Sequence, residues 1–514
     1  MKFGCVIAAA MAMAGSIGLS AAPAHAASAT SAPATVAQCP TIRFDRADAQ
    51  SRFGVVYDAA LRGLLDTNTV EDTQHVHDPI GRMTSPFRFV RAGSAYNTPW
   101  TRDAAINSWS AASLLEPAVA RNTLWAVCQR QSDGQIVVQQ DNQWWDQVIW
   151  IVAVWDHYCV TGDRTFLEQA FPVAQQTLAL RTAKQFRPND GLFAGPAFFA
   201  DGIAAYPPPE FDAKNPSSFV LDHPYTSQLM ALSTNCVYVE ALRCAGRMAE
   251  ALGQADSSRE FTTRADALRD RINARLWSAQ RQAYDYFIHG DGPDAGKSFA
   301  AQEGMGLSFA LLFDVADAQQ ASEIVRGAHV ERTGIVTLWP HLPQFDDAHP
   351  GRHNVMVWPI VSGFWGCATA KAGAAEPFAA QMEAFAELVR GSDLNFYEIY
   401  DARTGKPDGG WQCNRRWPPL SDQTWSASAY IAAIHRGLFG MRFDPDGLRF
   451  EPVLPASWGP VTLSGLRYRD MTLDLRLTGH DTRLKRMTID GQPVPTPVVP
   501  ASLTGAHRIE IELE

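Results

Sequence analysis

Several features that mark common protein classes are missing from this sequence. It has no basic run with interleaved aromatic residues, and its 54 acidic residues outnumber 44 lysines and arginines, so the net charge is −10. This balance argues against a nucleic-acid partner or an anionic-membrane surface. There is no GxGxxG after a predicted strand, no P-loop and no GxSxG motif. Nucleotide cofactors and serine-hydrolase chemistry therefore have no support.

Metal-ligand patterns are also missing. No pair of cysteines has zinc-finger spacing, and no two histidines form HExxH or a comparable motif among His75, His77, His223, His349 and His353. We therefore expect neither a metal site nor another cofactor.

Cysteine is scarce, and the number of cysteines that remain after the N-terminal segment is odd. Of the 8 cysteines, Cys5 lies in the N-terminal leader, which leaves an odd number spread over a long chain. Such a set is no disulfide framework, although an oxidising compartment leaves room for one or two bridges whose pairing the spacing does not assign.

Only the N-terminus carries a long apolar run. Lys2 precedes an Ala-rich apolar stretch at 6–19, and Ala24-His25-Ala26 is a small-x-small cleavage site. This pattern predicts a signal peptide over 1–26 and a periplasmic or secreted protein. No later segment has the length of a membrane span, so we expect no membrane anchor after cleavage.

Helical periodicity dominates the middle of the chain. No repeat of 20–50 residues is evident, which argues against a solenoid. Long loops recur between successive helix pairs, and loops of this length inside a helical domain are usually functional. The predicted helices span 48–65, 103–115, 117–130, 143–160, 164–186, 225–253, 257–276, 300–314, 317–328, 355–373, 376–390 and 423–437.

From Gly440 the apolar residues alternate with polar ones between Gly, Pro and Asp turns. This period predicts a run of antiparallel strands. We expect a leader at 27–46 that contributes a strand near 41–44, a helical catalytic domain at 47–439, and a small β-sandwich or sheet at 440–514.

The segment 395–434 contains the most informative carboxylate, Glu398, between Tyr397 and Tyr400. Sugar-cleaving sites combine rings that stack on sugar faces with a carboxylate that handles a proton. The alternative is a solvated surface glutamate. A second motif, Trp100-Thr101-Arg102-Asp103, leads into a helix, where Asp103 alone would suit the helix dipole.

Together the two motifs resemble glucoamylases and their six-hairpin relatives, which include trehalases, mannosylglycerate hydrolases and glycogen-debranching enzymes. The resemblance implies an (α/α)6 toroid with a small C-terminal antiparallel β domain. It implies that Trp100, Arg102 and Asp103 bind the terminal sugar. It also implies that Glu398, in the E-x-Y-D…T-W-S element, is the general base.

The loop 189–224 is more similar to that of the trehalase and mannosylglycerate-hydrolase relatives, which implies that Asp201 is the general acid. Glu210 and Asp212 are the alternatives, and both resemble exposed loop carboxylates. An acid that keeps its proton near neutral pH needs apolar surroundings that raise its pKa. We expect Phe198, Phe199 and Tyr206 to supply them.

Further ring-bearing and polar residues at helix starts and on the Glu398 loop are candidates for the sugar pocket. Several of the tryptophans have core packing as their alternative role. Capping is the alternative for Asn354, beside His353. The candidates are Trp144, Trp145, Asp146, His353, Trp358, Tyr400, Trp411 and Trp425.

We therefore expect an exported, inverting, exo-acting glycoside hydrolase for a small α-linked and, by resemblance, α-glucosidic substrate. Two carboxyls about 6.5–9.5 Å apart would flank the scissile bond and leave room for water. A glycoside phosphorylase of related fold and a non-catalytic carbohydrate-binding protein are the alternatives. The expected partner is a small carbohydrate, and the sequence leaves the oligomeric state open.

Overall fold

The computed structural model describes residues 39–139 and 141–514. The predicted signal peptide and most of the predicted leader lie outside these residues. Within the described part, no helix is long and apolar enough to cross a membrane.

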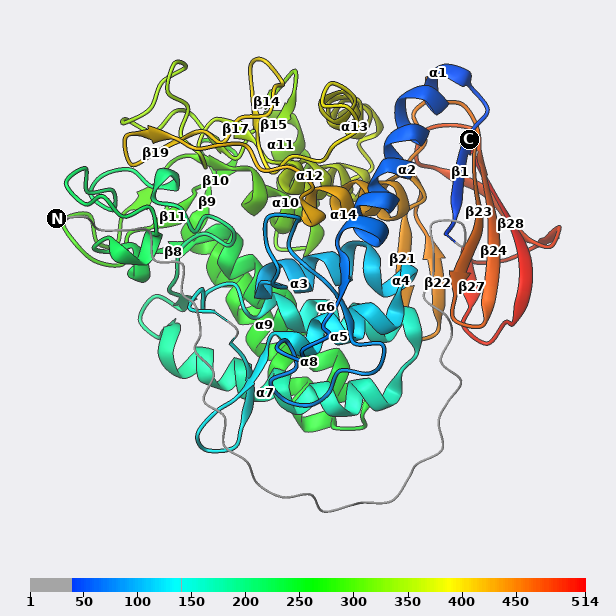
Figure 1. Ribbon diagram of the computed structural model, residues 1–514, viewed down its shortest axis with the longest axis horizontal. Helices are drawn as coiled ribbons and strands as arrows, with labels where there is room; N and C mark the ends of the chain where they lie inside the picture. The colour runs from blue at the N-terminus through cyan, green and yellow to red at the C-terminus, as the bar shows by residue number, and fades with distance from the viewer. Residues whose placement is uncertain (1–38, 140) are drawn as a thin grey trace. The chain divides into compact units, whose positions relative to one another are not determined.

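Helices make up most of the chain before residue 440 (Figure 1). Three of them are extended by π-helical turns, over Gly63–Thr67 after α2, over Ser108–Ala112 after α3 and over Ala433–Leu438 after α14. The principal helices are α2 (Val55–Arg62), α3 (Thr101–Asn107), α5 (Pro117–Ala126), α6 (Ile149–Thr161), α7 (Arg164–Gln185), α8 (Leu232–Ala251), α9 (Ala255–Leu276), α10 (Gly304–Leu312), α11 (Ala318–Gly327), α12 (Pro359–Lys371), α13 (Ala375–Arg390) and α14 (Thr424–Ala432).

The helices fall into two kinds by burial. Helices α3, α10 and α14 are buried along almost their whole surface, and α6 and α12 nearly so. Helices α9, α11 and α13 bury only one apolar stripe. A helix that is apolar all round must be covered on every side, whereas an amphipathic helix faces water.

The buried helices contact one another in a closed series. Helix α3 packs on α6, α6 on α8, α8 on α10, α10 on α12, α12 on α14, and α14 returns to α3. Within this part of the chain, α6 also packs on α7, α8 on α9, and α12 on α13.

Local signals explain where these helices begin and end. Asp163 accepts a hydrogen bond from the Phe166 amide and caps α7, and Asp317 with Gln320 forms a capping box on α11. Gly162 takes a left-handed conformation that ends α6. The predicted helix start at residue 143 is wrong, because α6 begins at Ile149 after a series of turns.

The C-terminal part is built from strands, drawn orange to red in Figure 1. One sheet has six strands: β1 (Thr41–Phe44), β23 (Val461–Tyr468), β24 (Met471–Thr478), β28 (Gly505–Leu513), β25 (Leu484–Ile489) and β26 (Gln492–Pro493). A second sheet has three: β21 (Met441–Asp444), β22 (Gly447–Phe450) and β27 (Val498–Pro500). Both sheets contribute to one apolar core that also contains residues of α2, α13 and α14.

One expectation about these strands is wrong. Strand β24 pairs with β28 in parallel, with Met471 opposite Gly505, so the domain is not purely antiparallel. Parallel neighbours need a long connection that returns the chain to the same end of the sheet. Residues 479–504, which include β25 to β27, provide that connection.

The cysteines of the described chain are mostly buried thiols that pack in the core. Free thiols are found at Cys128, Cys159, Cys236, Cys244, Cys367 and Cys413. In the described ranges 39–139 and 141–514, no group of three or more His, Cys, Asp or Glu side chains is arranged to hold a metal ion.

Candidate active site

A cavity of about 240 Å³ opens where the starts of several buried helices meet the long loops. Its wall carries five carboxyl groups and two guanidinium groups, a combination found in none of the larger cavities described in this structure. The lining residues are Ala92, Tyr96, Trp100, Arg102, Asp103, Asp141, Gln143, Asp146, Asp201, Arg352, Trp358, Glu398, Gln423 and Trp425.

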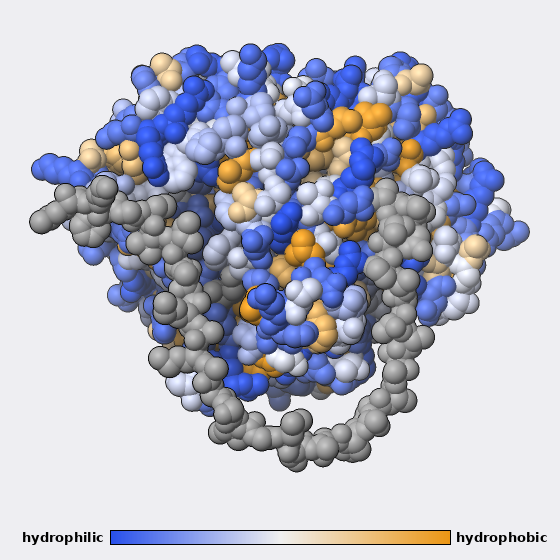
Figure 2. Space-filling view, viewed as in Figure 1, coloured by the Kyte–Doolittle hydropathy of each residue, from blue (hydrophilic) through white to orange (hydrophobic). Residues whose placement is uncertain are grey.

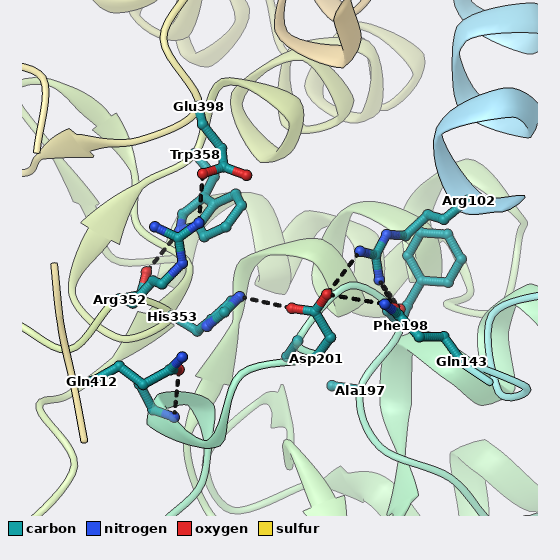
Figure 3. Close-up of polar contacts among 12 residues, drawn as sticks. Arg102, Gln143, Ala197, Phe198, Asp201, Arg352, His353, Trp358, Glu398 and Gln412 are labelled. Atoms are coloured by element: carbon teal, nitrogen blue, oxygen red, sulfur yellow. Dashed lines mark hydrogen bonds and ion pairs between the residues drawn. The ribbon is translucent and has the colours of Figure 1, made fainter. Parts of the chain in front are cut away.

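One side of the cavity is organised by Arg102, in the first turn of α3. Its guanidinium lies 3.2 Å from Asp146 and 3.3 Å from Asp201, and it also donates to the Phe198 carbonyl. Gln143 donates to the same Asp201 oxygen at 3.3 Å. We call these residues (Arg102, Gln143, Asp146, Asp201) with Asp103 the acid side of the cavity, and Figure 3 shows most of them.

The surroundings of Asp201 differ from the apolar ones that the sequence predicts. Burial favours its neutral form, but contacts with His353 and Arg102 outweigh it and hold the pKa of Asp201 below its ordinary value. Phe199 lies against the His353 ring instead, and Tyr206 turns its hydroxyl to the Ala197 amide and the Ala200 carbonyl. Asp201 is therefore ionised at neutral pH.

The other acidic groups on this side show the opposite tendency. Burial raises the pKa of Asp103 to about 7, and nearby Glu398 and Asp201 add to the rise while Arg102 opposes it. Burial also raises the pKa of Asp146 and that of Asp141. Like charges that share a dry site favour the neutral form of some members. These carboxyls can therefore donate as well as accept hydrogen bonds.

The opposite side of the cavity is formed by Glu398 and Arg352, which we call the base side. Arg352 Nη2 lies 2.5 Å from Glu398 Oε2, and the other guanidinium nitrogen donates to the Gly409 carbonyl at 3.1 Å. The Glu398 amide donates to the Leu420 carbonyl at 2.8 Å, which fixes this stretch against the following loop. Figure 3 shows Glu398 and Asp201 on separate loops, with Arg352 and His353 between them.

The aromatic candidates divide between the cavity and the core. Trp100 stands at the rim and is 37% exposed, whereas Trp358 and Trp425 form buried parts of the wall. Arg102 lies over the Trp425 ring, with 5.4 Å between the guanidinium carbon and the ring centroid. Figure 2 shows a face with mostly hydrophilic residues and small separate apolar groups. Among the described residues, the exposed large hydrophobic side chains are Val76, Trp100 and Val330, so an exposed tryptophan is unusual in this protein.

Five other candidates do not line the cavity. Trp145 is fully buried and donates to Ala197, and Trp144 packs edge-on against it. The Tyr400 hydroxyl bonds within its own loop. Trp411 contacts the His349 ring, and His353 lies behind Asp201. The candidates outside the wall are thus Trp144, Trp145, His353, Tyr400 and Trp411.

The alternative acids on the 189–224 loop also lie elsewhere. Glu210 is fully buried and contacts His289 Nδ1 at 2.6 Å, so its expected exposure is wrong. Asp212 is partly buried, and its amide faces His223. Neither carboxyl lines the cavity that contains Asp201.

The sequence does not single out five of the lining residues: Ala92, Tyr96, Asp141, Arg352 and Gln423. Tyr96 and Gln423 lie close to the motifs around Trp100 and Trp425, and this proximity is the one signal that could have found them. Arg352 follows Gly351 in an irregular loop and has no local motif.

Several polar atoms on the wall have no partner among the described residues. They are Arg102 Nε, Asp146 Oδ1, Gln423 Nε2 and Trp425 Nε1, none of which has a hydrogen-bond partner. Buried polar groups without a partner cost free energy, and a ligand that offers both donors and acceptors relieves that cost. A polyhydroxy ligand has this character at every carbon.

Comparison with known proteins agrees with this geometry. A family model described as mannosylglycerate hydrolase MGH1-like glycoside hydrolase domain matches residues 96–426. The glycosyl hydrolase family 65 C-terminal domain matches residues 441–498. No match was found among curated proteins.

Solved structures share the fold at low identity. A protein described as a sialidase has 15% identity and a TM-score of 0.66 over 90% of this chain. The GH78 rhamnosidase of Bacillus sp. GL1 has 16% sequence identity and a TM-score of 0.60 over 93% of this chain. This chain spans 41% and 44% of their lengths. The GH63 mannosylglycerate hydrolase of Thermus thermophilus, in complex with Tris and D-glycerate, has 16% sequence identity and a TM-score of 0.53. The match covers 73% of this chain and 99% of that chain.

The family match covers well over half of the chain and contains every lining residue of the cavity except Ala92. The chain therefore belongs to the family of MGH1-like glycoside hydrolase domains.

Proposed function

We propose that this protein is an inverting, exo-acting glycosidase in which Asp201 is the general acid and Glu398 the general base. The observation that carries the proposal is that two carboxyls from separate loops line one small cavity, each beside its own arginine. We further propose that the closed series of buried helices is the inner ring of an (α/α)6 toroid.

In this mechanism Asp201 gives its proton to the glycosidic oxygen as the bond to the anomeric carbon breaks. Glu398 takes a proton from a water that attacks the same carbon from the opposite face. The products are an aglycone alcohol and a sugar of inverted configuration. Because the pKa of Asp201 is held low, the fraction that carries the required proton rises as pH falls, and an acidic optimum is expected.

The size of the cavity supports a small substrate. Pockets for larger organic ligands have volumes of about 300–1,000 Å³, and the cavity here is about 240 Å³. One terminal sugar fills such a space, which favours exo-action on a short glycoside. The family resemblance favours an α-glucoside, and the name of the family adds mannosylglycerate to the substrates to be tested.

We also propose export to the periplasm or the medium, on the basis of the predicted signal peptide over 1–26. A phosphorylase would use phosphate as the nucleophile and needs no base, so a base-side carboxylate on the wall favours hydrolysis. A non-catalytic binding protein would keep Trp100, Arg102 and Asp103 but would have no need of Asp201 and Glu398.

The test is to measure turnover of α-linked disaccharides and small glycosides by Asp201→Asn and Glu398→Gln. Each substitution should lower kcat by about a thousandfold or more, because acid–base catalysis typically contributes about 10²–10⁴-fold. Asp212→Asn is the matched control, since Asp212 lies on the same loop as Asp201 but outside the cavity.

The stereochemistry is read from the first anomer released, followed by proton NMR. Release of the inverted anomer supports the two-carboxyl scheme. Release of the retained anomer, or wild-type turnover by either variant, contradicts it.

A further inference from the structure

Two consecutive residues separate the carboxyls of the cavity. Arg352 Nη2 lies 2.5 Å from Glu398 Oε2, and His353 Nε2 lies 3.5 Å from Asp201 Oδ1. Figure 3 shows the two side chains pointing in different directions, one to each carboxyl. One dipeptide therefore contacts both halves of the site.

This dipeptide is held firmly by its own backbone. The Arg352 amide donates to the Trp411 carbonyl at 2.9 Å, and its carbonyl accepts from Trp358 Nε1 at 2.8 Å. The His353 ring stacks on Trp358, with centroids 4.8 Å apart and planes 21° apart. Because each group has a fixed neighbour, the two side chains have little freedom to change direction.

Two glycines allow the acid and base loops to approach the dipeptide closely. A Cβ on Gly202, next to Asp201, would lie 2.5 Å from His353 Cε1. A Cβ on Gly410, in the loop after Glu398, would lie 2.5 Å from the Arg352 Cα, and the φ of Gly410 is +68°. Any larger residue at either position would displace the dipeptide or its loop.

We propose that Arg352 and His353 are positioning residues that set the orientation of Glu398 and Asp201 toward each other across the bound sugar. Arg352 lines the cavity and holds the base from its open side, whereas His353 lies outside the wall and holds the acid from behind. The inference rests on the proposed function, because it assigns a task only if both carboxyls react.

Positioning has a large kinetic value. A displacement of about 1 Å at a reacting group can reduce the rate about a hundredfold while binding is retained. The effect should therefore fall on kcat more than on KM.

The first experiment compares His353→Phe with His353→Gln. Phenylalanine keeps a ring on Trp358 but loses the 3.5 Å contact of His353 Nε2 with Asp201, whereas the glutamine amide again offers an N–H group toward that carboxylate. We expect His353→Phe to lower kcat by about tenfold to a hundredfold with KM changed less than about threefold, and His353→Gln to recover part of the loss. His349→Asn is the control, since His349 is exposed on the same loop.

The pH profile separates positioning from packing. His353→Phe removes one group that keeps Asp201 ionised, so the alkaline limb of kcat/KM should move to higher pH. Arg102 on α3 and Arg352 remain near Asp201 in this variant. The carboxyls that also face it, Asp103, Asp141 and Asp146, remain as well. An unchanged limb contradicts the assignment of His353.

The second experiment uses Arg352→Ala with guanidinium added at millimolar concentration. We expect kcat to fall by about a hundredfold and to recover several-fold as the free cation occupies the place beside Glu398. Arg415→Gln is the matched control. Arg352 and Arg415 both lie over the Trp417 ring, but Arg415 is exposed and does not line the cavity.

A failure of this inference can be told apart from a failure of the proposed function. If Asp201→Asn and Glu398→Gln are inactive but the Arg352 and His353 variants turn over at the wild-type rate, only this inference is overturned. If the carboxyl variants are active, the proposed function itself is overturned.

Discussion

The two sides of the cavity differ in how their carboxyl groups are paired with arginine. On the acid side one guanidinium, Arg102, contacts two carboxylates, and its side chain is 7% exposed. On the base side Arg352 contacts one carboxylate, Glu398, and one backbone carbonyl. The acid side is thus a network in which one cation contacts two carboxyl groups, whereas the base side is a single pair, and both cations are largely buried.

This difference predicts where a substitution affects the fold and where it affects only the chemistry. Removing the shared cation of a buried network leaves more than one charge without a partner. Removing one member of a single pair leaves one charge without a partner. The acid side should therefore be the more sensitive to loss of charge in both stability and turnover.

The largest expected effect is that of Arg102→Met. It leaves Asp146 and Asp201 without their cation, and breaking a buried pair costs about 3–5 kcal/mol. Turnover should fall by at least about a thousandfold, because the substitution also removes a cavity contact. Urea unfolding and steady-state kinetics measure the two effects. Arg352→Met is the comparison variant, and a loss of stability equal to that of Arg102→Met would contradict the distinction.

A smaller effect is expected at the rim, for Trp100→Ala. Because Trp100 is 37% exposed, its removal should change Tm little. Loss of a ring that stacks on the sugar should raise KM by about tenfold and leave kcat within about threefold. Trp100→Phe should recover most of the affinity. A variant that loses kcat and keeps KM would place Trp100 in the reacting site instead.

An effect on stability is expected in Asp103→Asn, as a changed pH dependence. The pKa of Asp103 is raised from 3.8 to about 7, so the folded state binds its proton more tightly than the unfolded state does. The wild-type protein therefore has this contribution in full below about pH 3.8 and loses it progressively as pH rises to about 7. The variant lacks the loss and should be about 1–3 kcal/mol more stable than the wild type at about pH 8.

Denaturant titrations of both proteins at about pH 5 and about pH 8 test this prediction. Asp291→Asn, at an exposed loop position, serves as the control. A stability difference that is the same at both pH values would show that burial of the Asp103 charge has no cost in the fold.

Much of the architecture was accessible from the sequence because it depends on local patterns. Apolar periodicity identifies the helices near their true positions, and alternation identifies the C-terminal strands. The start of α6 was misplaced because Trp144 and Trp145 extend the apolar pattern through turns that precede Ile149. The parallel β24–β28 pair was missed because alternation specifies a strand but not its neighbour.

The site divides in the same way. Arg102 and Asp103 belong to a short motif on one helix, so sequence alone could propose them. Arg352 meets its carboxylate 46 residues further along the chain, and only the fold brings the two together. The pKa of Asp201 was also out of reach, because it depends on Arg102 and His353 rather than on neighbours in the chain.

The pairing of β1 with β23 joins two distant parts of the chain, with Ile42 opposite Leu463. An ion pair between Asp45 and Arg476 adds a second link between the same regions. A segment that precedes the helices is thus paired with a strand that follows them, in addition to the contacts of α14 with α2 and α3. Contacts of such large sequence separation form late in folding, because the entropy of closing the loop must be met first. A chain that ends before Val461 lacks the partner of β1, so the β1–β23 pair can form only after the whole helical domain has been synthesised.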